Sequence, residues 1–299
     1  MPNKEERSMF DYVYLIMSVF CVSSTGVLGG YYTRRTADKK DASALYGFIE
    51  LCAVFLVWCV LFALNPSFDV AVLPYSLAFA IFFAMGMIGR IFALKTGSVV
   101  LTSLIIQSSL LAVSIWGIIF WNAPFTWNVG VGLTLVAAAL WLCLYSGKQE
   151  KTERKKISWK WLVFCLISFV GNTGCTITQR MQQMQFNGQH GNMLMMFASL
   201  CSALVGFAVY AKSDKKDTKV LLKKEWYWPV AAGVGNVFLN VFVMLMAVSS
   251  LSPTLIYPTI AVGGLIITTC FSVLAFREKL KWWQWVGVAI GIIATAILS

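Results

Sequence analysis

The feature that most constrains this chain is a series of continuous apolar runs, each about twenty residues long, the length that a helix needs to cross a bilayer. Charged residues make up only 12% of the chain. A soluble domain carries about 25%, so the composition excludes a soluble globular protein. The runs predict an all-α integral membrane protein with ten transmembrane helices, at residues 12–32, 43–64, 73–95, 98–120, 126–146, 159–181, 191–211, 227–248, 252–275 and 282–298.

Successive membrane helices end alternately on the two sides of the bilayer, which gives two sets of helix ends. Basic residues are divided unequally between these two sets. The set that includes both termini holds three of the 24 Lys and Arg residues, namely Lys4, Arg7 and Arg180. Basic residues resist translocation during insertion, so the opposite set is predicted to face the cytoplasm. Both termini are then expected outside a plasma or inner cell membrane. The net charge of +11 is explained by these membrane-flanking residues, and no nucleic-acid partner is expected.

The chain repeats itself about 150 residues apart. Residues 24–27 read STGV and residues 172–175 read NTGC, and Trp127 and Gly132 recur as Trp282 and Gly287. Five helices in each half is an odd number, so the second half enters from the opposite side. This predicts two inverted five-helix repeats, residues 1–147 and 159–299, joined by a basic cytoplasmic linker at 148–158. The alternative is a fold duplicated for stability alone.

The end of the chain resembles a known family. Pro258 near the middle of a helix is followed by Glu278 at an inner turn and by Gln284 and Gly287 at the start of the last helix. This pattern, within residues 247–291, is similar to the closing signature of the EamA-type branch of the drug/metabolite transporter superfamily. The first half lacks the equivalent proline and glutamate.

That resemblance implies ten helices in two inverted repeats and no covalent step. It implies a secondary transporter, an exporter or exchanger of small organic solutes such as amino acids, other metabolites or drugs, working by alternating access. We therefore expect no enzyme activity, no cofactor and no metal site. The alternative is a polytopic membrane scaffold or an intramembrane enzyme without transport activity.

Two charged residues lie well inside predicted helices. Glu50 and Arg90 are expected at similar depths in consecutive antiparallel helices, where pairing would relieve the cost of burying each charge. The functional hypothesis is a coupling site at which Glu50 accepts a proton. The alternatives are a fixed ion pair, or an Arg90 side chain that reaches the interface.

Uncharged polar residues are the next candidates for a solute site. Asn236 and Asn240 share one helix face, as do Asn172 and Gln179. Amides in membrane helices either line a wet cavity or bond a neighbouring helix. A neutral lining would suit a zwitterionic or polar solute better than a strongly anionic one. The full candidate set adds Gln107, Ser24 with Thr25, and Tyr257.

Three further features leave alternatives open. Pro253 and Pro258 are predicted to interrupt their helix, either at a solute site or as a kink that only shapes the bundle. Arg180, at the outer end of its helix, either draws a carboxylate or anchors the interface. Gly287 and Gly291 would permit close helix approach within one chain or between two, so the chain is expected to be a monomer or a homodimer.

Overall fold

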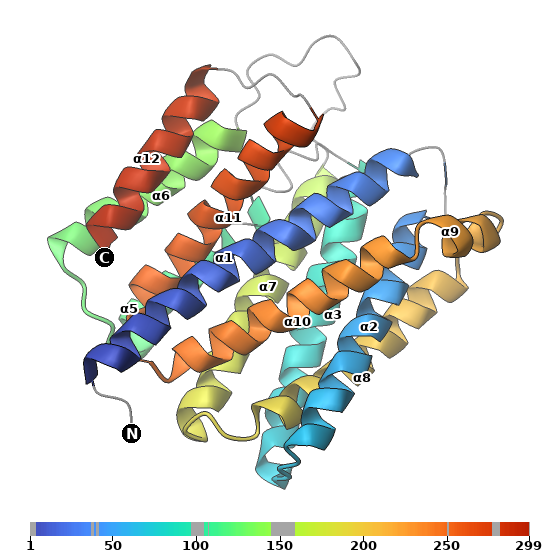
Figure 1. Ribbon diagram of the computed structural model, residues 1–299, viewed down its shortest axis with the longest axis horizontal. Coiled ribbons are helices and arrows are strands. Elements are labelled where there is room, and N and C mark those ends of the chain that lie inside the picture. Colours follow the sequence, from blue (N-terminus) through green and yellow to red (C-terminus); the bar gives the residue numbers. More distant parts are fainter. Residues whose placement is uncertain are drawn as a thin grey trace. The chain divides into compact units, whose positions relative to one another are not determined.

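The chain is all-helical in the computed structural model, which describes residues 4–36, 39, 42–96, 105–106, 108–144, 159–249, 251–276 and 282–298. No strand occurs in these ranges. The helices are α1 (Lys4–Arg35), α2 (Ala42–Leu64), the 3₁₀ helix η1 (Val70–Val72), α3 (Leu73–Thr96), α5 (Ser109–Phe120), α6 (Trp127–Leu144), α7 (Trp159–Gln185), α8 (Gly191–Ala211), α9 (Thr218–Lys224), α10 (Tyr227–Ala247), α11 (Pro253–Phe276) and α12 (Trp282–Leu298) (Figure 1).

Length and hydropathy support the membrane assignment. Within the described ranges, six helices are long and apolar enough to cross a bilayer, and four shorter apolar helical segments lie in α5, α6, α11 and α12. Large apolar side chains such as Leu56 and Ile119 lie exposed on the helix surfaces, as lipid-facing residues do. The predicted spans agree with these helices to within a few residues, except that α1 begins at Lys4 and the range 98–120 is described as a helix only at 105–106 and in α5.

The helices form two compact units. Unit 1 comprises Met1–Ala84 and Thr178–Ser249, and unit 2 comprises Met85–Ile177 and Ser250–Ser299. The chain passes from one unit to the other within α3 and again within α7. Each unit therefore contains residues from both halves of the sequence. The division into residues 1–147 and 159–299 remains a prediction about the repeat.

Unit 1 is built on two long helix seams. α1 lies along α10, and α2 packs against both α8 and α10. A Cβ atom added at Gly233 of α10 would lie 2.8 Å from the backbone oxygen of Glu50, so only glycine allows α2 and α10 to approach this closely. The short helix α9 rests against the end of α2 through Leu221, which is buried with Tyr32, Ala42, Leu45, Tyr46 and Ala232.

Unit 2 pairs α6 with α12 and packs α11 against α5, α6 and α12 (Figure 1). Val136, Val262 and Val288 are buried together where α6, α11 and α12 meet. α3 and α7 cross at Gly89, where an added Cβ atom would lie 2.7 Å from the backbone oxygen of Phe164. Small residues bring membrane helices together because close packing replaces the hydrophobic driving force that lipid removes.

The structure corrects the prediction for one of the two prolines. Pro253 is the first residue of α11, so it begins this helix and does not interrupt it. The first turn of a helix has no carbonyl partner for its N–H groups, so the missing N–H of proline costs nothing there. Pro258 does lie inside α11, and the helix continues past it to Phe276. Its role as a hinge stays a prediction.

Candidate functional site

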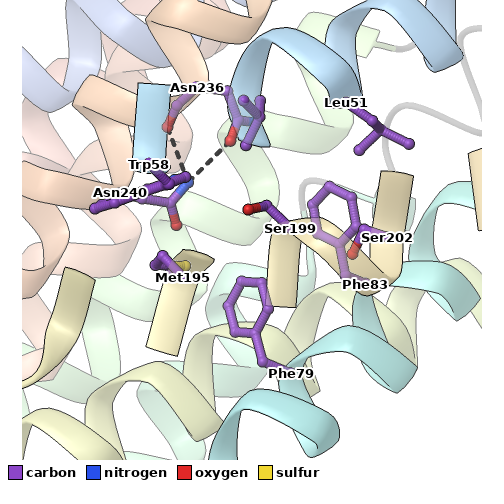
Figure 2. A pocket seen from close by; sticks show the side chains of 10 residues that line it. Leu51, Trp58, Phe79, Phe83, Met195, Ser199, Ser202, Asn236 and Asn240 are labelled. Atoms are coloured by element: carbon purple, nitrogen blue, oxygen red, sulfur yellow. Dashed lines mark hydrogen bonds between the residues drawn. The ribbon is translucent and has the colours of Figure 1, made fainter. Parts of the chain in front are cut away.

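A small, partly open cavity in unit 1 is lined by residues of α2, α3, α8 and α10 (Figure 2). Its volume is about 20 Å³, room for roughly one water molecule. Two of the predicted site residues, Asn236 and Asn240, lie on its wall. The other lining residues are Leu51, Val54 and Trp58 of α2, Phe79 and Phe83 of α3, and Met195, Ser199 and Ser202 of α8.

The two asparagines are oriented by hydrogen bonds. Asn240 Nδ2 donates to the backbone oxygen of Asn236 at 2.8 Å and to its Oδ1 at 2.9 Å (Figure 2). Gln179 of α7 donates from Nε2 to the backbone oxygen of Asn240 at 3.1 Å. The Asn236 Nδ2 and Asn240 Oδ1 atoms make no hydrogen bond to the part of the chain that the structure describes. The two lining amides therefore keep one donor and one acceptor that these hydrogen bonds do not use.

Two serines of α8 add further polar groups to the lining of the cavity. Ser199 Oγ donates to the backbone oxygen of Met196 at 3.0 Å, and Ser202 Oγ donates to that of Ala198 at 2.7 Å. Each hydroxyl proton is used within α8, so each oxygen keeps a lone pair that can accept a hydrogen bond. None of the ten lining residues is ionisable. An apolar, aromatic wall with a few convergent polar groups is typical of a small-molecule site.

Sequence reasoning found the amides of this cavity and missed its other walls. Asn236 and Asn240 were recognisable because an amide pair four residues apart is unusual in an apolar helix. Ser199 and Ser202 carry a similar signal, three residues apart on one face of α8. Trp58, Phe79 and Phe83 carry none, because an aromatic residue in an apolar helix is ordinary until its neighbours are known.

The end of α7 is polar and buried. Gln179 is 3% exposed, Arg180 6%, Gln182 0% and Gln183 2%. Gln182 Nε2 donates to the backbone oxygen of Gln189 at 2.9 Å, which holds the following turn against the helix. An interface anchor would extend its charged end into water. The burial of Arg180 therefore contradicts the interpretation of this residue as an interface anchor.

Two other predicted site residues lie at helix crossings. Asn172 of α7 packs on Gly86 of α3, where an added Cβ atom would lie 3.3 Å from Asn172 Oδ1. Ser24 of α1 packs on Gly235 of α10, where the corresponding distance to Ser24 Oγ is 3.0 Å. Asn172 and Ser24 are 148 positions apart, and the two glycines are 149 apart. Each unit thus contains the same kind of contact between a glycine and a polar residue.

The remaining candidates are distributed over both units. Glu50 is half-buried in α2 of unit 1, whereas Arg90 is exposed in the part of α3 that belongs to unit 2. Their pairing, and the proton coupling that it would support, stay predictions. Tyr257 is 1% exposed in α11 of unit 2. Gln107 and Glu278 lie outside the described residues.

Comparison with known proteins identifies the second half of the chain. Residues 159–299 match the model of the EamA-like transporter family. These residues belong to that family. EamA is a member of the drug/metabolite transporter superfamily, so the resemblance drawn from Pro258, Glu278, Gln284 and Gly287 is confirmed. The family match and the apolar helices together indicate a multi-pass membrane protein whose second half is of a transporter type.

Structural comparison agrees with this fold over the whole length. A solved structure titled "Crystal structure of protein" superposes with a TM-score of 0.71. The superposition covers 97% of this chain and 96% of the other, with 11% sequence identity. At that identity the likeness establishes the fold alone. A search of curated proteins found no match.

Proposed function

We propose that this EamA-like protein is a secondary transporter that carries a small, uncharged polar solute through the cavity of unit 1. The observation that carries the proposal is the amide donor and acceptor of Asn236 and Asn240 among aromatic walls inside a membrane bundle. A scaffold has no need of such a group in its apolar interior. An uncharged solute fits best because a charge inside a bilayer needs a partner, and no ionisable side chain lines this cavity.

Helix pairing supports the inverted repeat on which alternating access would depend. α2 pairs with α8, α5 with α11, and α6 with α12. In each of these pairs, a helix of the first predicted repeat packs against the helix at the same position in the second repeat. Helices related by a two-fold axis pair in this way when they lie beside the axis. The Gly86–Asn172 and Gly235–Ser24 contacts support the same relation.

The small volume of the cavity supports a mechanism in which the surrounding helices move apart to admit the solute. A pocket that encloses a small molecule has about 300 Å³ or more, whereas this cavity has about 20 Å³. Solute entry would therefore require α2, α3, α8 and α10 to part. Rocking of one repeat against the other would widen the cavity toward each side of the membrane in turn. We expect export or exchange, with any coupling proton carried by Glu50.

A ligand screen tests the proposed function. Purified protein is heated with amino acids, nucleobases, sugars and cationic drugs, and the melting temperature is recorded. A solute that binds the folded state raises the melting temperature by mass action. Uncharged polar compounds are expected to raise it more than cations or anions of similar size. Compounds that raise the melting temperature are then tested for uptake into proteoliposomes. Binding without any transport would favour the alternatives, a scaffold or an intramembrane enzyme.

Thiol labelling tests the inverted topology. Ser67, after α2, and Ser213, after α8, occupy equivalent loops of the two predicted repeats. In a background without the eight native cysteines, each serine is replaced in turn with cysteine. A membrane-impermeant maleimide added to intact cells is expected to label Ser67→Cys, and to label Ser213→Cys only after permeabilisation. Labelling of both from one side would contradict the inverted repeat.

A further inference from the structure

The connection between α8 and α10 carries a basic surface that the transport proposal does not use. We call residues 212–226 the basic segment. It joins two candidate membrane spans, Gly191–Ala211 and Tyr227–Ala247, and includes α9. Six exposed lysines lie in it, at positions 212, 215, 216, 219, 223 and 224, against three acidic residues.

One side of the basic segment is fixed to the protein. Asp217 Oδ1 lies 3.5 Å from Lys39 Nζ, and Glu225 Oε1 lies 3.6 Å from Arg35 Nη1. Glu225 Oε2 also accepts a hydrogen bond from Trp228 Nε1 at 2.9 Å. Leu221 is 4% exposed in the core beneath α9. These contacts engage two of the three acidic side chains and orient α9 with Leu221 inward.

The opposite side of the basic segment combines positive charge with apolar groups. Lys219 and Lys223 are four residues apart and share the face of α9 that points away from Leu221. Beside them Val220 is 50% exposed and Leu222 43% exposed. Trp226, 49% exposed, follows at the entry to α10. Tryptophan at the end of a membrane span is typical of the headgroup region.

We propose that this side of the basic segment binds the headgroups of anionic phospholipids in the adjacent leaflet. Lysine ammonium groups meet the phosphates, while Val220, Leu222 and Trp226 enter the boundary between headgroups and acyl chains. The apolar groups favour a lipid over a soluble polyanion, because a soluble partner would leave them in water. The position of the segment between two spans keeps it at headgroup depth. This proposal is independent of the transported solute.

The test compares two short-chain lipids that differ in headgroup charge. The full chain, purified in a neutral detergent, is titrated with dioctanoyl phosphatidylglycerol or dioctanoyl phosphatidylcholine, and the melting temperature is followed. We expect half-saturation at least about tenfold lower for the anionic lipid, given about fivefold in affinity for each lysine near the surface. High salt is expected to reduce the preference, because exposed charges are screened.

Substitutions at α9 separate this surface from general charge effects. The variant with Lys219→Gln, Lys223→Gln and Lys224→Gln is expected to lose the tenfold preference. The matched variant with arginine at the same three positions is expected to keep it, as is Lys160→Gln, which removes an exposed lysine at the start of α7. Equal affinity of the wild type for both lipids would overturn the proposal. So would an undiminished preference in the glutamine variant, or an equal shift with inorganic phosphate alone.

Discussion

Gly89→Ala is expected to lower the melting temperature of the purified protein by about 2–12 °C. A Cβ atom at this position would lie 2.6 Å from the backbone nitrogen of Ser168 and 2.7 Å from the backbone oxygen of Phe164. Both are backbone atoms of α7, so no rotamer change relieves the overlap, and α3 and α7 must separate. Overpacking of this kind lowers the free energy of unfolding by about 1–3 kcal/mol. Each kcal/mol lost lowers the melting temperature of a domain of 150–250 residues by about 2–4 °C.

Gly86→Ala is the matched control, one helical turn earlier on the same face of α3. There the added Cβ atom would lie 3.3 Å from Asn172 Oδ1, which belongs to a side chain that can move by a few tenths of an ångström. The melting temperature is expected to fall much less than for Gly89→Ala. Thermal denaturation in one detergent, with size-exclusion profiles before heating, compares the two variants. Equal melting temperatures for Gly89→Ala and the wild type would contradict the close crossing of α3 and α7.

Asn240→Leu is expected to weaken solute binding by about tenfold to a hundredfold. Leucine keeps the branched shape of asparagine and its number of side-chain heavy atoms, although its methyl groups are larger than the amide oxygen and nitrogen. The substitution removes the acceptor Oδ1 and the bond that orients Asn236. A polar group of the solute left without its partner costs about 1–3 kcal/mol, and about 1.4 kcal/mol is a factor of ten. The measurement is the concentration at which the most effective solute of the screen half-saturates the rise in melting temperature.

Asn128→Leu makes the same substitution at an exposed position of α6, outside the cavity. It is expected to bind the solute as the wild type does. The melting temperature of Asn240→Leu without solute is expected to stay near that of the wild type, because leucine suits an apolar interior. Loss of binding with retained stability would assign the solute to this cavity. Undiminished binding by Asn240→Leu would place the solute elsewhere and remove the basis of the transport proposal.

The positions of most membrane helices could be predicted from the sequence to within a few residues. Helices such as α2, α8 and α10 begin and end within a residue or two of the predicted spans, because the apolar run and its polar flanks define a membrane helix locally. α9 was missed because seven residues with three lysines resemble an ordinary charged loop. The orientation of the termini and the number of crossings remain predictions.

The candidate site could be predicted only in part, because polar residues predicted for the same site occupy different environments in the structure. Asn236 and Asn240 do line a cavity, whereas Ser24 and Asn172, predicted on equal grounds, lie against glycines at helix crossings. All four are polar residues in apolar helices, so composition treats them alike. Which of them lines a cavity depends on the neighbouring helix, and that is a property of packing.

The sequence by itself determined that the chain is helical, that it lies in a membrane, and that its second half carries an EamA-type signature. These properties depend on the length of apolar runs and on local motifs. Only the tertiary structure decided that Trp58, Phe79 and Phe83 line the same cavity as the asparagines, that Pro253 begins a helix, and that Arg180 is buried. Lipid tails are as apolar as a protein interior, so hydrophobicity identifies the spans without showing which face of each helix meets its neighbours.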